Sequence, residues 1–141
     1  MRISRRGEYG LAAVLYLASQ PDGKLSLRGE IAGRCGIPST FLAQILARLR
    51  NQGILGSVRG AHGGYYLKTA PERLSLADVL EALEGPITLI RSIKDENNPE
   101  ADFVNTTVRR FFGRLQTRGY ELLKSMKIAE MLPADDGKPV P

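Results

Sequence analysis

The sequence predicts a mainly α-helical protein with one small β-hairpin and a long helix towards its C-terminus. Along most of the chain apolar residues recur at helical spacing, and one glycine-rich stretch separates two short β-prone runs. The chain has 141 residues, of which 43% are hydrophobic. This is enough to build one compact domain with an appended segment.

A buried helix is expected from Ser4 to Ser19, because leucine, valine and alanine fill its helical positions. The turn sequence PDG at 21–23 ends it. Arginines precede the apolar run LAAVLYLA and imitate a secretory signal, but Glu8 and Tyr9 interrupt the flank. The run is too short to cross a membrane, so we expect neither a membrane span nor export.

Two short helices joined by a turn are predicted next. Ser26 is a candidate cap for the first helix, which the residues GIP at 36–38 end. Ser39 or Thr40 is a candidate cap for the second, which stops at Gly53. This arrangement is typical of a helix-turn-helix, whose second helix enters the major groove of DNA, although any helical hairpin shows the same spacing.

The outward face of the second helix favours DNA binding over a plain helical hairpin. Its side chains are small or carry hydrogen-bonding groups suited to base edges and phosphates. No acidic residue occurs from 31 to 71, whereas a merely solvated face normally mixes both charges. The candidate contacts on this helix are Ser39, Thr40, Ala43, Gln44 and Arg48, and Ala47 and Asn51 share the face.

A β-hairpin is predicted after this helix. The β-prone runs ILGSV and YYLKT flank RGAHGG, which is too rich in glycine for a helix. A hairpin that follows a helix-turn-helix is a wing. Arg59 is the expected DNA contact at its tip, and the glycines allow a close backbone approach to a partner. His62 is interpreted either as a phosphate contact or as a solvated tip residue.

The same stretch excludes several kinds of chemistry. It lacks the Gly-Lys-Ser/Thr ending of a P-loop and the third glycine of a dinucleotide fingerprint. One cysteine and one histidine cannot supply the usual zinc ligands or four cluster thiolates. Ser57 lies near His62, but no acid occurs between Glu30 and Glu72 to orient an imidazole. We therefore expect no enzyme, no metal site and no cofactor.

A further helix follows the wing, with Ser75 as its cap and with Gly85 and Pro86 at its end. The polar sequence KDENNPEAD at 94–102 predicts a loop. The tail at 133–141 is expected to be disordered.

The last helix is expected from Phe103 to Leu132. Apolar residues recur along it every seven positions. The resulting apolar stripe is too long for one small domain to cover. The helix either packs back onto its own domain or pairs with a second copy, and Gly119 favours the second interpretation by permitting close approach. The two rows are Val108, Leu115, Leu122 and Ala129, and Phe112, Gly119 and Met126.

The charge pattern assigns contact with a polyanion to the first half of the chain. Residues 1–70 hold ten lysines and arginines against three acids, a net charge of +7, whereas residues 71–141 carry −2. We expect a winged helix-turn-helix DNA-binding domain at 1–84, then a linker loop and dimerisation helix at 85–132.

Four blocks in the first 90 residues resemble the Rrf-two (Rrf2) family of bacterial winged-helix transcription regulators, which includes IscR, NsrR and CymR. The blocks are MRISRRGEYGLAAVLYLA, IAGRCGIPSTFLAQILARLRNQGIL, SVRGAHGGYYL and LADVLEALEGP. The resemblance implies that the helix at 39–52 reads the major groove, with Thr40 and Gln44 facing DNA, and that Arg59 enters the minor groove. Some members carry a charged residue where this chain has Ala43, so their operator sequence does not carry over.

The chain departs from the family in its cysteines. Iron–sulfur members carry three of them before the dimerisation helix, and the corresponding segment here, ITLIRSIKDENNPEADFVNTT, has none. Cys35 lies in the helix-turn-helix turn and is interpreted as a small core residue rather than a redox switch. A carboxylate such as Glu8 without neighbouring thiolates is a poor substitute ligand.

The sequence therefore predicts a cytoplasmic, sequence-specific DNA-binding transcriptional regulator, a homodimeric repressor without an iron–sulfur cluster. The alternative is a winged-helix module that binds another protein, which would be indifferent to DNA. The motifs do not identify an effector. We expect one to act at the interface of the first and last helices or at the 94–102 loop.

Overall fold

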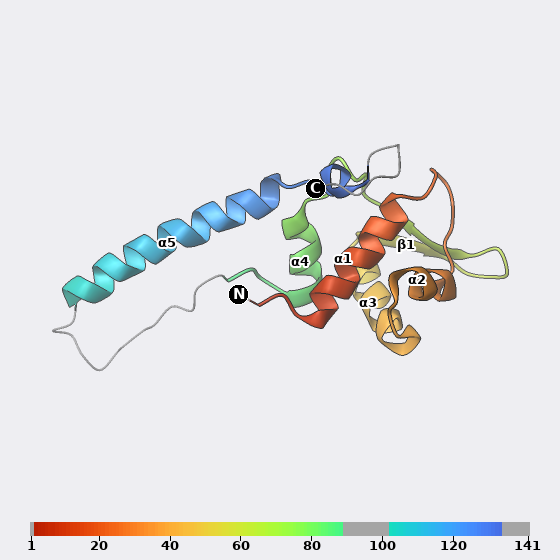
Figure 1. Cartoon of the computed structure of the whole chain (residues 1–141), viewed down its shortest axis with the longest axis horizontal. Helices are drawn as coiled ribbons and strands as arrows, with labels where there is room; N and C mark the ends of the chain where they lie inside the picture. The colour runs from red at the N-terminus through yellow and green to blue at the C-terminus, as the bar shows by residue number, and fades with distance from the viewer. Residues whose placement is uncertain (1, 89–101, 134–141) are drawn as a thin grey trace.

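The fold is mainly helical, with a two-stranded antiparallel hairpin, as the sequence predicts (Figure 1). The computed structural model describes residues 2–88 and 102–133. No helix among these residues has the length and apolar character to span a membrane. The elements are α1 Arg5–Ala18, α2 Arg28–Cys35, α3 Ser39–Asn51, β1 Leu55–Val58, β2 Gly64–Leu67, α4 Leu76–Glu84, α5 Asp102–Ser125 and α6 Ile128–Met131.

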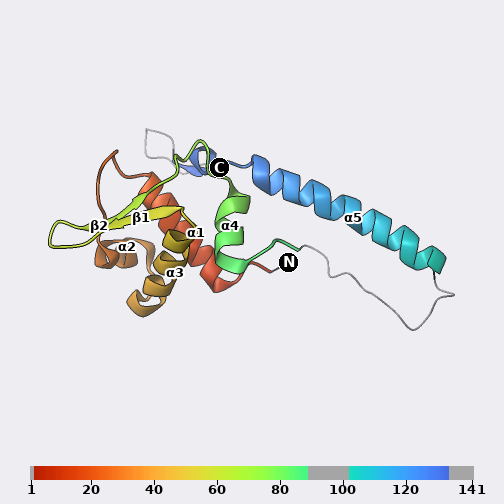
Figure 2. The same cartoon turned by 180° about the vertical axis from the view of Figure 1, so that it is seen from behind.

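The hydrophobic core lies between α1, α3 and α4. Val14, Leu46 and Leu83, one from each helix, are fully buried there. Helix α1 runs through the middle and contacts α2, α3, α4, β2 and α6 (Figures 1 and 2). This core fixes the helix-turn-helix and the hairpin relative to each other.

The predicted Ser75 cap of α4 is confirmed, and Ser4 caps α1 as well. The Ser4 hydroxyl accepts a hydrogen bond from the Gly7 backbone N–H at 3.3 Å and begins α1. Ser75 and Asp78 form a reciprocal capping box at α4, with both hydrogen bonds at 3.0 Å. The end of α4 at Gly85, whose φ is +84°, is also as predicted.

The other predicted caps are wrong. Helix α2 has Leu27 at its N-cap, and the Ser26 side chain is buried without a hydrogen-bond partner. The Ser26 backbone instead pairs with Tyr65 through hydrogen bonds of 3.0 and 2.8 Å, which holds Ser26 out of the capping position. Helix α3 begins at Ser39 with Pro38 as its N-cap, so neither Ser39 nor Thr40 caps it.

The wing hairpin pairs Leu55 with Leu67 and Val58 with Gly64. Its two consecutive glycines serve the protein's own packing. A Cβ at Gly63 would overlap the Val58 carbonyl oxygen, and one at Gly64, where φ is +151°, would lie 2.8 Å from Ser26 O. The close approach that these glycines permit is therefore intramolecular, and it docks the wing against the residue before α2.

Helix α5 projects from the body at the end opposite the wing (Figures 1 and 2). Its C-terminal half packs against α4, where Tyr120 and Leu123 meet Leu80. The Gln116 side chain also donates to Ile87 O at 2.8 Å. No apolar side chain from the first half of α5 joins this hydrophobic cluster among the described side chains, which begin at residue 106.

The prediction of one helix up to Leu132 is wrong, because α5 ends at Ser125. The backbone of Met126 and Ile128 pairs with the strand-like segment before α4, through hydrogen bonds of 2.8 Å from Leu76 N and to Leu74 O. Because these backbone groups bond outside the helix, the helix ends before them. Ile128 then starts α6 with its side chain fully buried in the main core. The predicted loop lies outside the described residues, apart from Asp102 at the start of α5, and so does the tail from 134.

Candidate nucleic-acid interface

Helix α3 is held by one apolar face. Leu42, Ile45, Leu46 and Leu49 are all buried at the core. At the start of the helix, Phe41 packs edge-on against Tyr9 of α1, with ring centroids 5.6 Å apart. Because a helix buries one stripe and exposes the other, the polar face of α3 must point outward.

The outward face carries the residues that the sequence selects. Ser39, Thr40 and Gln44 are exposed, and Ala43 is half-buried between them. Asn51 is exposed one turn beyond Ala47 on the same face. No acidic side chain interrupts α3, so its outward surface offers hydroxyl, amide and methyl groups to a partner.

Arg48 lies at the edge of this face and is tied to the body. Its Nη1 donates to the Leu83 carbonyl oxygen at 2.7 Å. Nη1 of Arg6 in α1 reaches the same oxygen at 3.4 Å. Two cations thus lie at the C-terminus of α4, where helix carbonyls lack intrahelical partners. Helical spacing alone does not reveal this bond, since Leu83 is 35 residues away in sequence.

The wing presents the two other candidate contacts. Arg59 and His62 are both exposed in the turn between β1 and β2. The hairpin extends beyond α2 at the end of the body away from α5 (Figure 2). Helix α3 and the wing are therefore separate protrusions of one body, which is the geometry of a winged helix.

A groove of about 460 Å³ separates the wing from α2. Arg28, Arg50 and Arg59 line it, one from the start of α2, one from the end of α3 and one from the wing. Arg28 and Arg50 are not among the sequence-based candidate contacts, because periodicity does not show that α2 lies beside the wing. The basic character of 1–70 is the one sequence signal that includes them.

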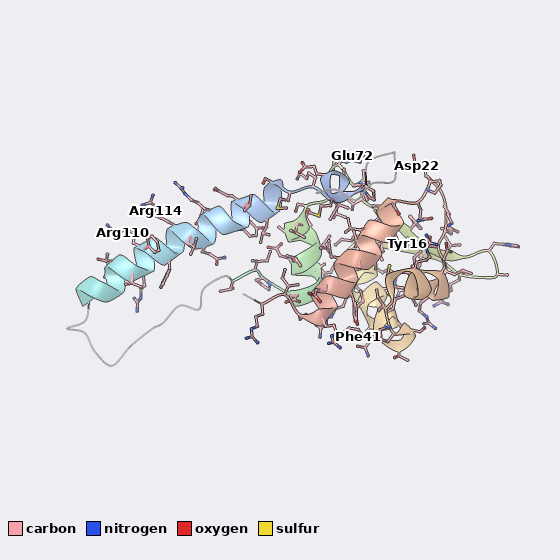
Figure 3. All side chains as sticks on the ribbon, in the orientation of Figure 1. Tyr16, Asp22, Phe41, Glu72, Arg110 and Arg114 are labelled. Atoms are coloured by element: carbon pink, nitrogen blue, oxygen red, sulfur yellow. The ribbon has the colours of Figure 1, made fainter. Side chains whose placement is uncertain are left out.

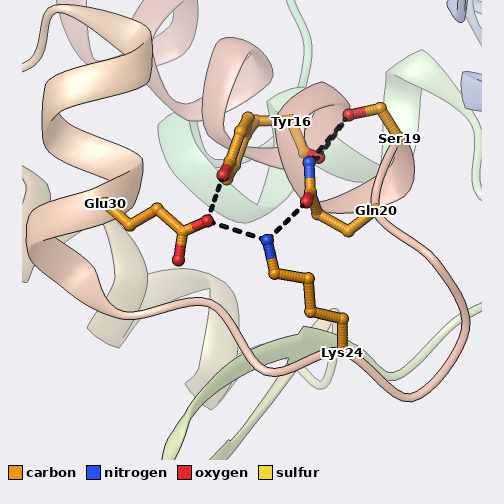
Figure 4. A network of polar contacts seen from close by, with 5 residues as sticks. All are labelled: Tyr16, Ser19, Gln20, Lys24 and Glu30. Atoms are coloured by element: carbon orange, nitrogen blue, oxygen red, sulfur yellow. Dashed lines mark hydrogen bonds and ion pairs between the residues drawn. The ribbon is translucent and has the colours of Figure 1, made fainter.

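A polar network around Glu30 of α2 sets the position of that helix (Figure 4). The Glu30 carboxylate accepts hydrogen bonds from Lys24 Nζ at 2.9 Å and from the Tyr16 hydroxyl at 2.7 Å. Lys24 Nζ also donates to the Gln20 amide oxygen at 2.9 Å. The bonds from Lys24 and Tyr16 lower the pKa of Glu30, so the carboxylate stays ionised and joins α1, α2 and the intervening loop.

Cys35 behaves as a structural residue. Its thiol is partly buried and lies 3.7 Å from the Ala12 carbonyl oxygen. Burial raises the pKa of the Cys35 thiol, which disfavours the reactive thiolate. These observations support its interpretation as a small core side chain.

Comparison with known proteins gives consistent matches. Residues 3–134 match the model of the Rrf2 family, described as an iron-dependent transcriptional regulator. The chain is 32% identical to the HTH-type transcriptional regulator CymR of Bacillus subtilis over 139 residues, which cover 98% of this chain and 94% of CymR.

Two solved structures share the fold. The structure of CymR, described as the global cysteine regulator of B. subtilis, has a TM-score of 0.77 at 29% identity and covers 92% of this chain and 94% of that one. T. potens IscR has a TM-score of 0.71 at 28% identity and covers 93% of this chain and 85% of that one. The likeness includes the winged helix.

The residues present do not fit the iron of the family description. The whole chain contains one cysteine and one histidine. Within residues 2–88 and 102–133, no three histidine, cysteine, aspartate or glutamate side chains gather in a metal-ligating group. Burial raises the pKa of the Cys35 thiol, which disfavours the thiolate form that an iron ligand requires.

Proposed function

Because the chain belongs to the Rrf2 family of DNA-binding transcriptional regulators, we propose that it is a homodimeric repressor that reads two DNA half-sites with α3 and the wing. The observation that carries the proposal is the acid-free outward face of α3, fixed from behind by four buried side chains and flanked by an arginine-bearing wing. A dimer seated on an operator represses by occupying it.

In this proposal the outward face of α3 enters the major groove. Gln44 and Thr40 hydrogen-bond to base edges, and Ser39 at the helix start contacts a phosphate. The Ala43 methyl group contacts apolar base surface such as a thymine methyl. The donors of Arg48 that Leu83 does not use reach the DNA backbone at the edge of the helix.

The wing supplies the remaining contacts. Arg59 enters the minor groove, where an extended cationic side chain meets the strongest negative potential. His62, exposed beside it, contacts a phosphate.

The proposed dimer forms through α5. Five large apolar side chains along this helix are exposed, among them Phe111 at 64% and Leu122 at 61%. Exposed apolar stripes of this length mark interaction surfaces, and a second copy of α5 offers a matching stripe. The remaining members are Val108, Phe112 and Leu115.

The proposal divides the chain into a DNA-binding domain at 1–84 and a linker and dimerisation segment at 85–132. It assigns no catalytic step and no cofactor to the chain, and it places the protein in the cytoplasm with its DNA. An effector acts at the interface of the first and last helices or at the 94–102 loop, where a displacement changes the spacing of the two DNA-binding units.

Selection of binding sites from random duplex DNA tests the proposal. The full-length protein is expected to enrich a palindromic site, and at fixed salt Gln44→Ala and Arg59→Ala are each expected to weaken operator binding by about 1–3 kcal/mol. Arg34→Ala is the control. Arg34 lies in the last turn of α2, near enough to Tyr16 and Cys35 for its charge to favour a lower pKa in both groups.

Two results would overturn the proposal. If both variants, shown to be folded, bind the operator as tightly as the parent, α3 and the wing are not the contact surface. If the parent enriches no site and its DNA affinity is indifferent to salt, the winged helix serves protein interaction instead.

A further inference from the structure

The groove between α2 and the wing is strongly cationic. Its lining includes three arginines and no acidic side chain. None of the guanidinium groups of Arg28, Arg50 and Arg59 forms a hydrogen bond or an ion pair with another described residue. Three unpaired cations on one concavity repel each other, and an anion bound between them relieves that repulsion.

Backbone donors add to this positive charge. Helix α2 starts at the groove, and its N-cap, Leu27, provides no side-chain hydrogen bond. The Arg28 and Gly29 backbone N–H groups therefore have no protein partner among the described residues. They lie at the positive end of the helix dipole, where oxyanions bind well.

The groove suits the backbone of DNA better than a free ion. Leu27 and Val58, which also line it, are exposed at 55% and 47%. Apolar surface beside arginines matches a deoxyribose beside its phosphate. The groove also lies between the first helix of the helix-turn-helix and the wing, the two elements that straddle a DNA strand when α3 lies in the major groove.

We propose that this groove binds one backbone phosphate of the operator in each half-site, held by Arg28, Arg50 and the first backbone amides of α2. The inference rests on the proposed function. Arg59 lies at the edge of the groove, and its side chain extends into the minor groove of the DNA. Its guanidinium therefore reads DNA shape, while those of Arg28 and Arg50 bind the backbone phosphate. The contact carries no sequence information and fixes the register of α3.

Salt dependence separates a phosphate contact from a base contact. Arg28→Ala and Arg50→Ala are each expected to weaken operator and unrelated duplex by the same factor. In the double variant, the DNA association constant K is expected to depend less on salt. The negative slope of log K against log[salt] is expected to become shallower by about 0.9 for each protomer, or about 1.8 for a dimer. Arg34→Ala, the same change at the other end of α2, is expected to leave the slope within about 0.3 of the parent.

A neutral methylphosphonate placed at each operator phosphate in turn locates the contact. The parent is expected to lose affinity at one phosphate per half-site, and the double variant is expected to show no further loss there. Circular dichroism and thermal unfolding of both proteins check that the fold is intact.

Failure of this inference differs from failure of the proposed function. If the double variant keeps the parent's slope and methylphosphonate profile while Gln44→Ala loses operator affinity, the groove binds no phosphate but the regulator stands. A change in the ratio of operator to unrelated binding would show that the groove reads bases, which also contradicts the inference. If DNA binding by the parent protein does not depend on salt, the proposed function itself is contradicted.

Discussion

The two glycines where the turn of the wing meets β2 separate what the sequence predicts from what tertiary packing decides. The stretch HGGYY predicts a tight hairpin, and the hairpin is present. The neighbours that exclude a Cβ at Gly63 and Gly64, namely Val58 and the Ser26 backbone, come from outside this stretch. Their identity depends on tertiary packing, which also explains why Ser26 is a buried pairing residue and not a cap.

We expect Gly63→Ala to destabilise the fold by about 1–3 kcal/mol, because the new Cβ overlaps the Val58 carbonyl oxygen and distorts the hairpin. Gly33→Ala is the matched control. Gly33 is exposed inside α2, and a Cβ added there would meet nothing within 4 Å, so alanine is expected to stabilise the fold by about 0.5–1 kcal/mol. Urea unfolding of both variants measures the two signs, and equal effects would contradict the packing described here.

The Glu30 carboxylate makes stability depend on acid pH. Its pKa is lowered by Lys24 and Tyr16, so its contribution is complete above the ordinary glutamate value of about 4.3 and is lost as pH falls through the folded-state pKa. The urea midpoint of the parent is expected to exceed that of Glu30→Gln near pH 7, with the gap closing below about pH 4. A gap that persists unchanged to about pH 3 would show that the network in Figure 4 does not depend on the charge.

At the scale of elements, α3 is the one whose role its own sequence predicts best. The apolar stripe and the acid-free polar face are both present in 39–51, and the structure buries the first and exposes most of the second. What the sequence does not show is the bond from Arg48 to Leu83, because that partner lies in α4. Arg48 therefore combines a candidate DNA contact with a structural tie between two helices.

This difference predicts distinct effects for two substitutions on the same helix. Arg48→Ala is expected to lower the free energy of unfolding by about 1 kcal/mol through loss of its bond to Leu83 O, as well as to weaken DNA binding. Gln44 is exposed and has no protein partner among the described residues, so Gln44→Ala is expected to weaken DNA binding alone. Thermal unfolding beside DNA titration distinguishes them, and equal stability of the two variants would argue against the tie.

Helix α5 shows the limit of periodicity as a guide. The seven-residue recurrence correctly indicates a long apolar stripe, but it continues through Ala129, which lies in α6. The helix ends earlier because Met126 and Ile128 pair with the segment before α4. Such long-range backbone pairing leaves no pattern in the local sequence. Ile128, which follows it, is fully buried, and an apolar residue is expected there whether or not the helix continues.

At the scale of the whole molecule, α5 makes an amphipathic arm. Its exposed apolar residues lie along one side, while Arg110 and Arg114 project from it into solvent (Figure 3). The C-terminal half of α5 packs on α4, as the first alternative for this helix predicts, and its first half exposes an apolar surface. Pairing with a second copy stays a prediction. The sequence could not divide the helix in this way, because both halves share one pattern.

A charge on the apolar stripe is expected to prevent pairing of two arms. Leu115→Glu is predicted to sediment as a monomer at concentrations where the parent is a dimer, and to lose operator affinity because one protomer meets only one half-site. Thr117→Glu adds the same charge to α5 beside Arg114 and Arg118 and is expected to remain dimeric. A dimeric Leu115→Glu protein would place the interface elsewhere.

Hydroxyl-radical footprinting of the full-length protein on its selected site measures whether two copies of α3 and the wing read one operator. We expect protected backbone in two segments on one face of the duplex, with centres about one helical turn, or roughly 10 base pairs, apart or a multiple of that distance. In Gln44→Ala both segments are expected to lose protection together. A single protected segment, or protection that is the same on the selected site and on unrelated DNA, would contradict the claim.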